Sequence, residues 1–125
     1  MILDTNAISD LVERNWTLVE MVDKATDAAL PFIAVAEYQR GLLGSTKPQK
    51  GQAILDGLRE ILPLILADNQ TITLYAEIGD QLKRIGRPIP TNDIWIAALA
   101  RQHELPILSK DRHFDHVPGI RRIDW

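Results

Sequence analysis

Short apolar runs alternate along the chain with longer stretches in which apolar residues recur every three or four positions. The short runs are typical of buried parallel strands, and the periodic stretches are typical of amphipathic helices. Strands are predicted at residues 1–3, 30–35, 106–109 and 120–125, and residues 71–73 as a short strand or a helix cap. Strands separated by helices indicate right-handed βαβ units, and therefore an α/β fold with a mostly parallel sheet of four to five short strands.

Helices are predicted after Asp4, at 18–29, from 37 to 41 or 44, and at 48–66, 74–85 and 92–103. The fourth of these carries one apolar stripe, formed by Ile54, Leu58, Ile61, Leu62 and Ile65. Pro63 is expected to kink or end this helix. The last helix is apolar nearly all round, which implies burial, and Thr91 is its predicted N-cap.

Length and composition set the remaining bounds. A chain of 125 residues is long enough for a core, and we expect one domain over residues 1–125. It has no cysteine and no apolar run of membrane-spanning length, and Asp4 leaves no room for the apolar region of a signal peptide. These features predict a cytoplasmic protein. The net charge of −3 gives no global sign of nucleic-acid binding.

Four acidic residues stand out by their placement, because each comes just after a predicted strand or at the start of a helix: Asp4, Glu37, Asp93 and Asp111. In a parallel sheet such positions share one edge, where active sites collect. Each acid alone also has a simpler structural explanation. Asp4 and Asp93 could cap helices, Glu37 could pair with Arg40, and Asp111 could be a turn residue. If Thr5 or Asn6 caps the first helix, the Asp4 carboxylate is free for chemistry.

Converging carboxylates repel one another unless a cation lies between them. Mg²⁺ and Mn²⁺ prefer carboxylate and water ligands. In such a site, a metal-bound water typically becomes the nucleophile that attacks a phosphate ester. The three histidines, His103, His113 and His116, are scattered, so we interpret them as ordinary surface or loop residues rather than zinc ligands.

Several of these motifs resemble those of the PIN-domain family, and among its members the VapC-type toxins of bacterial type II toxin–antitoxin pairs. They are Asp4-Thr5-Asn6 after the first strand, Glu37 near Gly41, Asn92-Asp93 opening an Ile-Ala-Ala helix, the segment 109–114, and the ending Val117-Pro118-Gly119-Ile120 with Asp124-Trp125. The similarity covers essentially the whole chain.

The resemblance implies a three-layer α/β/α ribonuclease that depends on Mg²⁺ or Mn²⁺. It implies that Asp4 and Asp93 ligate the metal, that Glu37 and Asp111 complete the acidic cluster, and that Asn6 and Ser109 support the site by hydrogen bonds. A homodimer and a cognate VapB-like antitoxin are also implied. Asp115 is a rival to Asp111 as the fourth acid.

Cleavage of RNA needs cations that contact phosphates. The candidates nearest the predicted site in sequence are Arg84, Arg87, Lys110 and Arg112, although each could equally be a solvated surface residue.

Two other function classes stay open. One is a non-catalytic PIN-like binding module whose acids only cap helices. The other is an aspartyl-phosphate phosphohydrolase with Asp4 as nucleophile. Haloacid-dehalogenase-type phosphatases resemble this start of the chain, but they need a second Asp where this sequence has Asn6.

Overall fold

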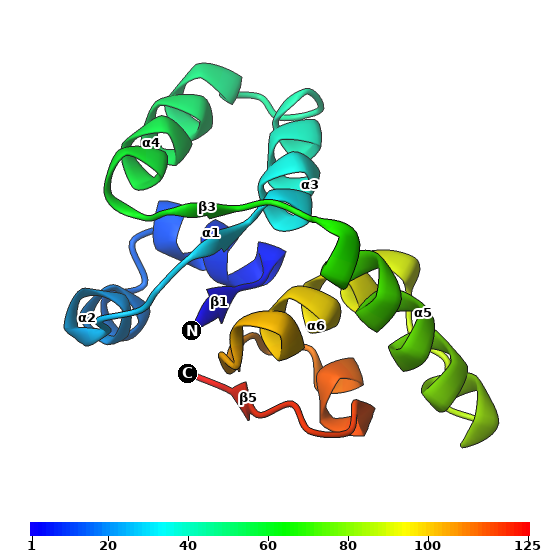
Figure 1. Ribbon diagram of the computed structural model, residues 1–125. Coiled ribbons are helices and arrows are strands. Elements are labelled where there is room, and N and C mark those ends of the chain that lie inside the picture. The colour runs from blue at the N-terminus through cyan, green and yellow to red at the C-terminus, as the bar shows by residue number, and fades with distance from the viewer.

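The computed structural model describes all residues, 1–125, and places five two-residue parallel strands among six helices (Figure 1). The strands are β1 (Ile2–Leu3), β2 (Leu30–Pro31), β3 (Leu64–Ile65), β4 (Ile107–Leu108) and β5 (Arg122–Ile123). The helices are α1 (Thr5–Val12), α2 (Trp16–Lys24), α3 (Phe32–Leu42), α4 (Pro48–Ile61), α5 (Asn69–Arg84) and α6 (Thr91–His103), and a 3-10 helix, η1, covers Arg112–His116.

The sheet has β1 at its centre. β4 pairs with β1 in parallel, Leu3 opposite Leu108, and β5 pairs with the far side of β4. On the other side of β1, a parallel bridge from Ile2 to Ala29 leads into β2, which pairs with β3. The spatial order is therefore β3-β2-β1-β4-β5, and the predicted parallel α/β architecture is confirmed.

This order places a topological switch point between β1 and β4. The chain leaves β1 toward β2 on one side, and β4 enters on the other side. A crevice therefore opens beyond the carboxyl ends of these two strands, which is where α/β proteins bind ligands. Asp4 follows β1 and Ser109 follows β4, so the strand register itself brings the two side chains together.

The short strands β1 and β4 lie in the middle of the hydrophobic core. Both residues of β1 and of β4 are fully buried, and so are Ile96, Leu99 and Phe114. The nearly all-apolar sequence of α6 correctly predicted its burial, since residues 96–100 have no exposed surface. α5 packs along α6, and α3 packs against α1 and α4. No helix is both long and apolar enough to cross a membrane.

Several predicted boundaries were wrong. The apolar run 30–35 is a strand only at Leu30–Pro31, and α3 begins at Phe32. The helix predicted at 18–29 runs from Trp16 to Lys24. The helix predicted to reach residue 66 ends at Ile61, because Pro63 cannot continue it and Leu64–Ile65 pairs with β2 as a strand.

The predicted apolar stripe of α4 was partly correct, because Leu58, Leu62 and Ile65 pack against the core. Leu55, outside the predicted stripe, is nevertheless the fully buried apolar residue of α4, whereas Ile61 is 73% exposed. A period of 3.6 residues therefore identifies a helix more safely than it identifies which of its residues are fully buried.

Two helix starts differ from the prediction for local reasons. Residues 71–73 lie inside α5, whose cap is Asp68: its carboxylate accepts hydrogen bonds from the amides of Gln70 and Thr71, while the Thr71 hydroxyl accepts from the Asp68 amide. Thr91 is the first residue of α6 rather than its cap. Pro90 occupies the cap position without a side-chain hydrogen bond.

A candidate active site at the carboxyl end of the sheet

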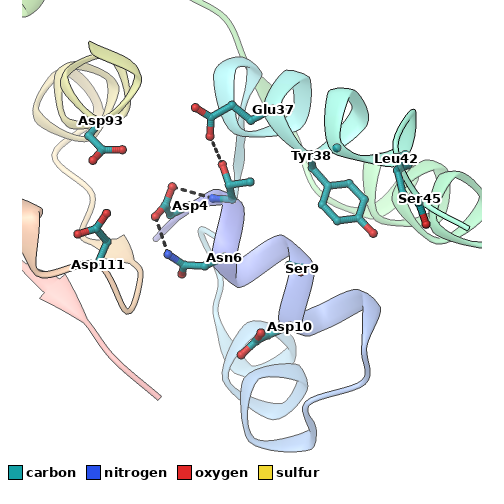
Figure 2. Close-up of a pocket in the computed structure, with 12 residues that line it drawn as sticks. Asp4, Asn6, Ser9, Asp10, Glu37, Tyr38, Leu42, Ser45, Asp93 and Asp111 are labelled. Carbon is teal, nitrogen blue, oxygen red and sulfur yellow. Dashed lines mark hydrogen bonds between the residues drawn. The ribbon is translucent and has the colours of Figure 1, made fainter. Parts of the chain in front are cut away.

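A cleft of about 630 Å³ opens at this edge of the sheet, and all four predicted acids line it (Figure 2). They reach it from different elements: Asp4 from the end of β1, Glu37 from α3, Asp93 from the first turn of α6, and Asp111 from the segment after β4. Figure 2 shows Asp93 and Asp111 facing Asp4 and Glu37 across the same space. Acids separated by up to 107 positions in the sequence therefore line the same cleft.

Asp4 is the most deeply buried of the four, with 4% of its surface exposed. It is the N-cap of α1: Oδ1 accepts a hydrogen bond of 2.7 Å from the amide of Thr5. Oδ2 accepts from the Ser109 hydroxyl at 2.7 Å and from the Asn6 amide at 3.0 Å. The expectation that Thr5 or Asn6 caps the helix was therefore wrong, because Asp4 itself caps α1 while its second oxygen faces the cleft side.

Asn6 and Ser109 form the support that the resemblance implied. The Asn6 side chain donates to Ser109 Oγ at 3.2 Å and accepts from the Lys110 amide at 3.2 Å. The Ser109 hydroxyl also accepts from the Asp111 amide at 2.9 Å. This network ties the end of β1 to the end of β4 and fixes the positions of Asp4 and Asp111 together.

Glu37 is held by two neutral donors. The Thr5 hydroxyl donates to Oε2, and the Asn92 side-chain amide donates to Oε1. Glu37 therefore links α3 to the starts of α1 and α6. No lysine or arginine pairs with it, so the predicted alternative of an ion pair with Arg40 is not seen.

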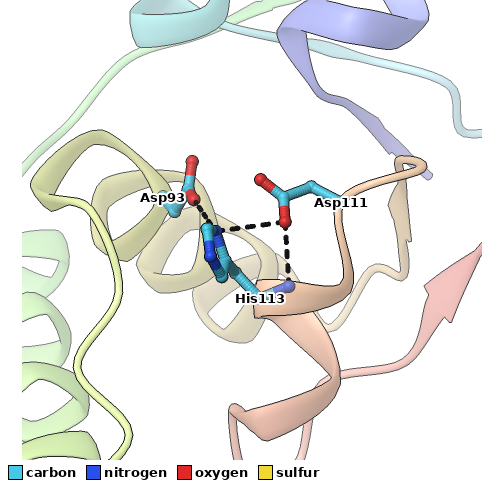
Figure 3. A group of neighbouring side chains, drawn as sticks. All are labelled: Asp93, Asp111 and His113. Carbon is cyan, nitrogen blue, oxygen red and sulfur yellow. Dashed lines mark hydrogen bonds and ion pairs between the residues drawn. The ribbon is translucent and has the colours of Figure 1, made fainter.

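Asp93, Asp111 and His113 form a group in which one ligand atom of each lies within 4.8 Å of the others (Figure 3). His113 Nδ1 lies 3.3 Å from Asp93 Oδ2 and 3.1 Å from Asp111 Oδ1. His113 is exposed, as expected of a surface histidine, but its contact with two site acids was not foreseen.

The electrostatics of the cleft are one-sided. Five carboxyl groups line it (the four acids and Asp10), and no lysine or arginine does. Burial raises the pKa of Asp4, assisted by the nearby charges of Glu37 and Asp111 and opposed by the hydrogen bonds from Ser109 and Thr5. Burial, then repulsion from Asp4 and Asp111, raises the pKa of Asp93 to about 6, although His113 acts in the opposite direction.

The rival fourth acid lies elsewhere. Asp115 forms a two-contact ion pair with Arg122, at 2.8 Å and 3.2 Å, and does not line the cleft. The Arg122 guanidinium keeps the pKa of Asp115 below its usual range. The geometry favours Asp111.

None of the four predicted RNA-contacting cations lines the cleft. Lys110 pairs with Asp10 at 2.7 Å and lies over the Trp125 ring, and Arg84 pairs with Asp80. Arg87 and Arg112 are exposed and form no ion pair. RNA contacts by these residues stay a prediction. Lys110 and Arg112 both flank Asp111, and of these two Arg112 forms no ion pair.

Sequence reasoning missed several residues that line the cleft: Ser9 and Asp10 on α1, Tyr38 on α3, and Ser45 in the loop after α3. A signal for two of them was present. Ser9 follows Thr5, and Asp10 follows Asn6, at a spacing of four residues, so they continue the polar face that starts at the site.

The family model for the PIN domain matches residues 1–120. The chain belongs to the PIN domain family. Among curated relatives, it is 31% identical to the toxin FitB of Neisseria gonorrhoeae, over 89% of this chain and 87% of FitB. It is 27% identical to ribonuclease VapC1 of Haemophilus influenzae (strain R2866), over 98% of this chain and 96% of the relative.

Solved structures agree with this relationship. The DNA-bound VapBC complex from Salmonella typhimurium contains a chain that superposes with a TM-score of 0.91 at 27% identity, covering 99% of this chain and 96% of that one. The similarity extends over nearly the full length of both chains, so the cleft lies within the shared fold.

Proposed function

We propose that this protein is a metal-dependent endoribonuclease and the toxin of a toxin–antitoxin pair. The observation that carries the proposal is the convergence of Asp4, Glu37, Asp93 and Asp111 on one cleft that contains no lysine or arginine. Relatives of similar length named as ribonuclease and toxin support it.

The donor set fits Mg²⁺ or Mn²⁺. Its ligand atoms are mainly carboxylate oxygens, and the raised pKa values of Asp4 and Asp93 indicate negative charge that the protein alone leaves uncompensated. We assign Asp4 and Asp93 as direct ligands, with Glu37 and Asp111 completing the cluster. When bound, the ion supplies charge compensation at the phosphate and acidifies a coordinated water.

The residues of the chain would contribute positioning. Asn6 and Ser109 hold the Asp4 carboxylate from one side, and the Thr5 amide holds it from the other. Asn92 and Thr5 hold Glu37 on the same side as Asp4, and Asp93 and Asp111 face both across the cleft. Hydrolysis requires water to attack phosphorus while the P–O bond to a ribose oxygen breaks. Carboxylates fixed on both sides of the cleft can orient that water without moving themselves.

The partners follow from the relatives. Solved structures of similar chains include VapBC and FitAcB complexes, and VapBC is a family of toxin–antitoxin systems, which supports a VapB-like antitoxin as the partner here. We also keep the homodimer as a proposal. Leu64, Leu66 and Ile72, on the segment from β3 to the start of α5, are exposed apolar side chains that such an interface could bury.

The purified protein should cleave single-stranded RNA in Mg²⁺ or Mn²⁺, lose this activity in EDTA, and regain it when the ion is restored. The measurement is gel-resolved cleavage of a labelled RNA at matched ionic strength. Cleavage that persists in EDTA would rule out the metal-dependent mechanism. Absence of cleavage together with absence of metal binding would instead favour the non-catalytic module.

A further inference from the structure

We propose that the His113 imidazole is a ligand of the metal site, so that the Asp93–Asp111 half of the cluster selects first-row transition-metal ions over Mg²⁺. This inference rests on the proposed function, because it concerns the same site. It adds a nitrogen donor to a cluster that the sequence predicts to be formed by carboxylates alone.

The spacing of the ligand atoms carries the argument. His113 Nδ1 lies 3.1 Å from Asp111 Oδ1 and 3.3 Å from Asp93 Oδ2 (Figure 3). Adjacent ligands of an octahedral ion with bonds of 2.0–2.1 Å are separated by about 3 Å. The nitrogen therefore occupies, relative to both carboxylates, the place of a neighbouring ligand.

The fold holds His113 in this place through residues on both sides of it in the chain, Asp111 and Phe114. Asp111 is the N-cap of η1, and its Oδ1 accepts a 2.9 Å hydrogen bond from the His113 amide. Phe114, the next residue, is fully buried in the core. The backbone of His113 is thus anchored on both sides, while 48% of its side chain stays exposed at the mouth of the group.

The chemical consequence is selectivity. Mg²⁺ takes oxygen ligands and keeps several waters, whereas an imidazole nitrogen stabilises first-row transition-metal ions. The Asp4–Glu37 half of the cleft offers oxygen ligands only. Of the three histidines, His113 is the one whose ring nitrogen lies within 4.8 Å of carboxylate oxygens of Asp93 and Asp111.

The test uses Mn²⁺ as the probe, with the full-length protein. Pulsed electron paramagnetic resonance of the Mn²⁺ complex should show coupling to a directly bound ¹⁴N nucleus, and His113→Gln should remove it. In calorimetric titrations with Ni²⁺ and Mg²⁺, His113→Gln should weaken Ni²⁺ binding by about tenfold and change Mg²⁺ binding by less than about twofold. The matched control, His103→Gln on an exposed position of α6, should leave both the coupling and the affinities unchanged.

Three results would overturn the inference. If Mn²⁺ binds but shows no nitrogen coupling, or if His113→Gln weakens Mg²⁺ and Ni²⁺ binding equally, His113 only supports the acids by hydrogen bonds and the proposed nuclease site stands. If Mn²⁺ does not bind the wild-type protein at all, both the inference and the proposed metal-dependent function fail.

Discussion

Replacing Asp93 with asparagine is expected to reduce RNA cleavage by at least about 10²–10³-fold, the range found when a group that stabilises transition-state charge is removed. Asparagine keeps the size of the side chain and can still hydrogen-bond His113, but it removes the charge that is proposed to hold the ion. The same substitution should abolish growth arrest when the protein is expressed without an antitoxin.

The matched control is Asp23→Asn, because Asp23 is exposed on α2 and does not line the cleft. Single-turnover cleavage rates at saturating Mn²⁺ separate a catalytic loss from weakened metal binding. Asp111→Asn should impair cleavage, whereas Asp115→Asn should not, because Asp115 pairs with Arg122 outside the cleft. Undiminished cleavage by Asp93→Asn would remove Asp93 from the mechanism.

The metal-free protein is expected to lose stability as the pH rises from 5 to 8. The pKa of Asp93 is raised to about 6 in the folded protein, so the folded state holds this proton more tightly than the unfolded chain. The resulting stabilisation is complete at pH values below the ordinary aspartate pKa near 4, and it is lost as the pH passes through about 6. Asp4, whose pKa is also raised, acts in the same direction.

A pKa displaced by about two units corresponds to about 3 kcal/mol. Asp93→Asn should therefore make the metal-free protein more stable than the wild type at pH 8, by about 2–3 kcal/mol, and this difference should fall to about half at pH 5. Urea unfolding in EDTA at both pH values gives these free energies of unfolding directly. Mg²⁺ at pH 8 should restore the wild-type stability and have little effect on the variant. Equal stabilities of the two proteins at pH 8 would show that the cluster carries no electrostatic strain.

Both predictions concern acidic residues whose place in the fold could be predicted from the sequence. Asp4 and Asp111 follow short apolar strands, and parallel strands end at a common edge, so their convergence was predictable without knowing a single distance. Asp93 was predictable because it belongs to the polar start of a helix whose middle, residues 96–100, is apolar and buried.

Other features depend on contacts that periodicity does not encode. Leu64–Ile65 continues the apolar pattern of α4, and only its pairing with β2 makes it a strand. The Thr91 hydroxyl could cap a helix that began at Asn92, but α6 begins at Thr91 itself, so Pro90 occupies the cap position. His113 became significant only when α6 and η1 were placed side by side, since Asp93 is 20 residues away in the sequence.

The proposed metal site is tested most directly by calorimetric titration of Mn²⁺ into the wild-type protein and Asp4→Asn, with Asp23→Asn as the control. The buried carboxylate of Asp4 lies where β1 and β4 meet, and its removal leaves the Ser109 and Asn6 hydrogen-bond partners in place. We predict saturable binding by the wild type and the control, and affinity at least about tenfold weaker in Asp4→Asn, a difference of about 1.4 kcal/mol or more. Equal Mn²⁺ affinity in all three proteins, or no binding by the wild type, would contradict a metal centre at this cleft.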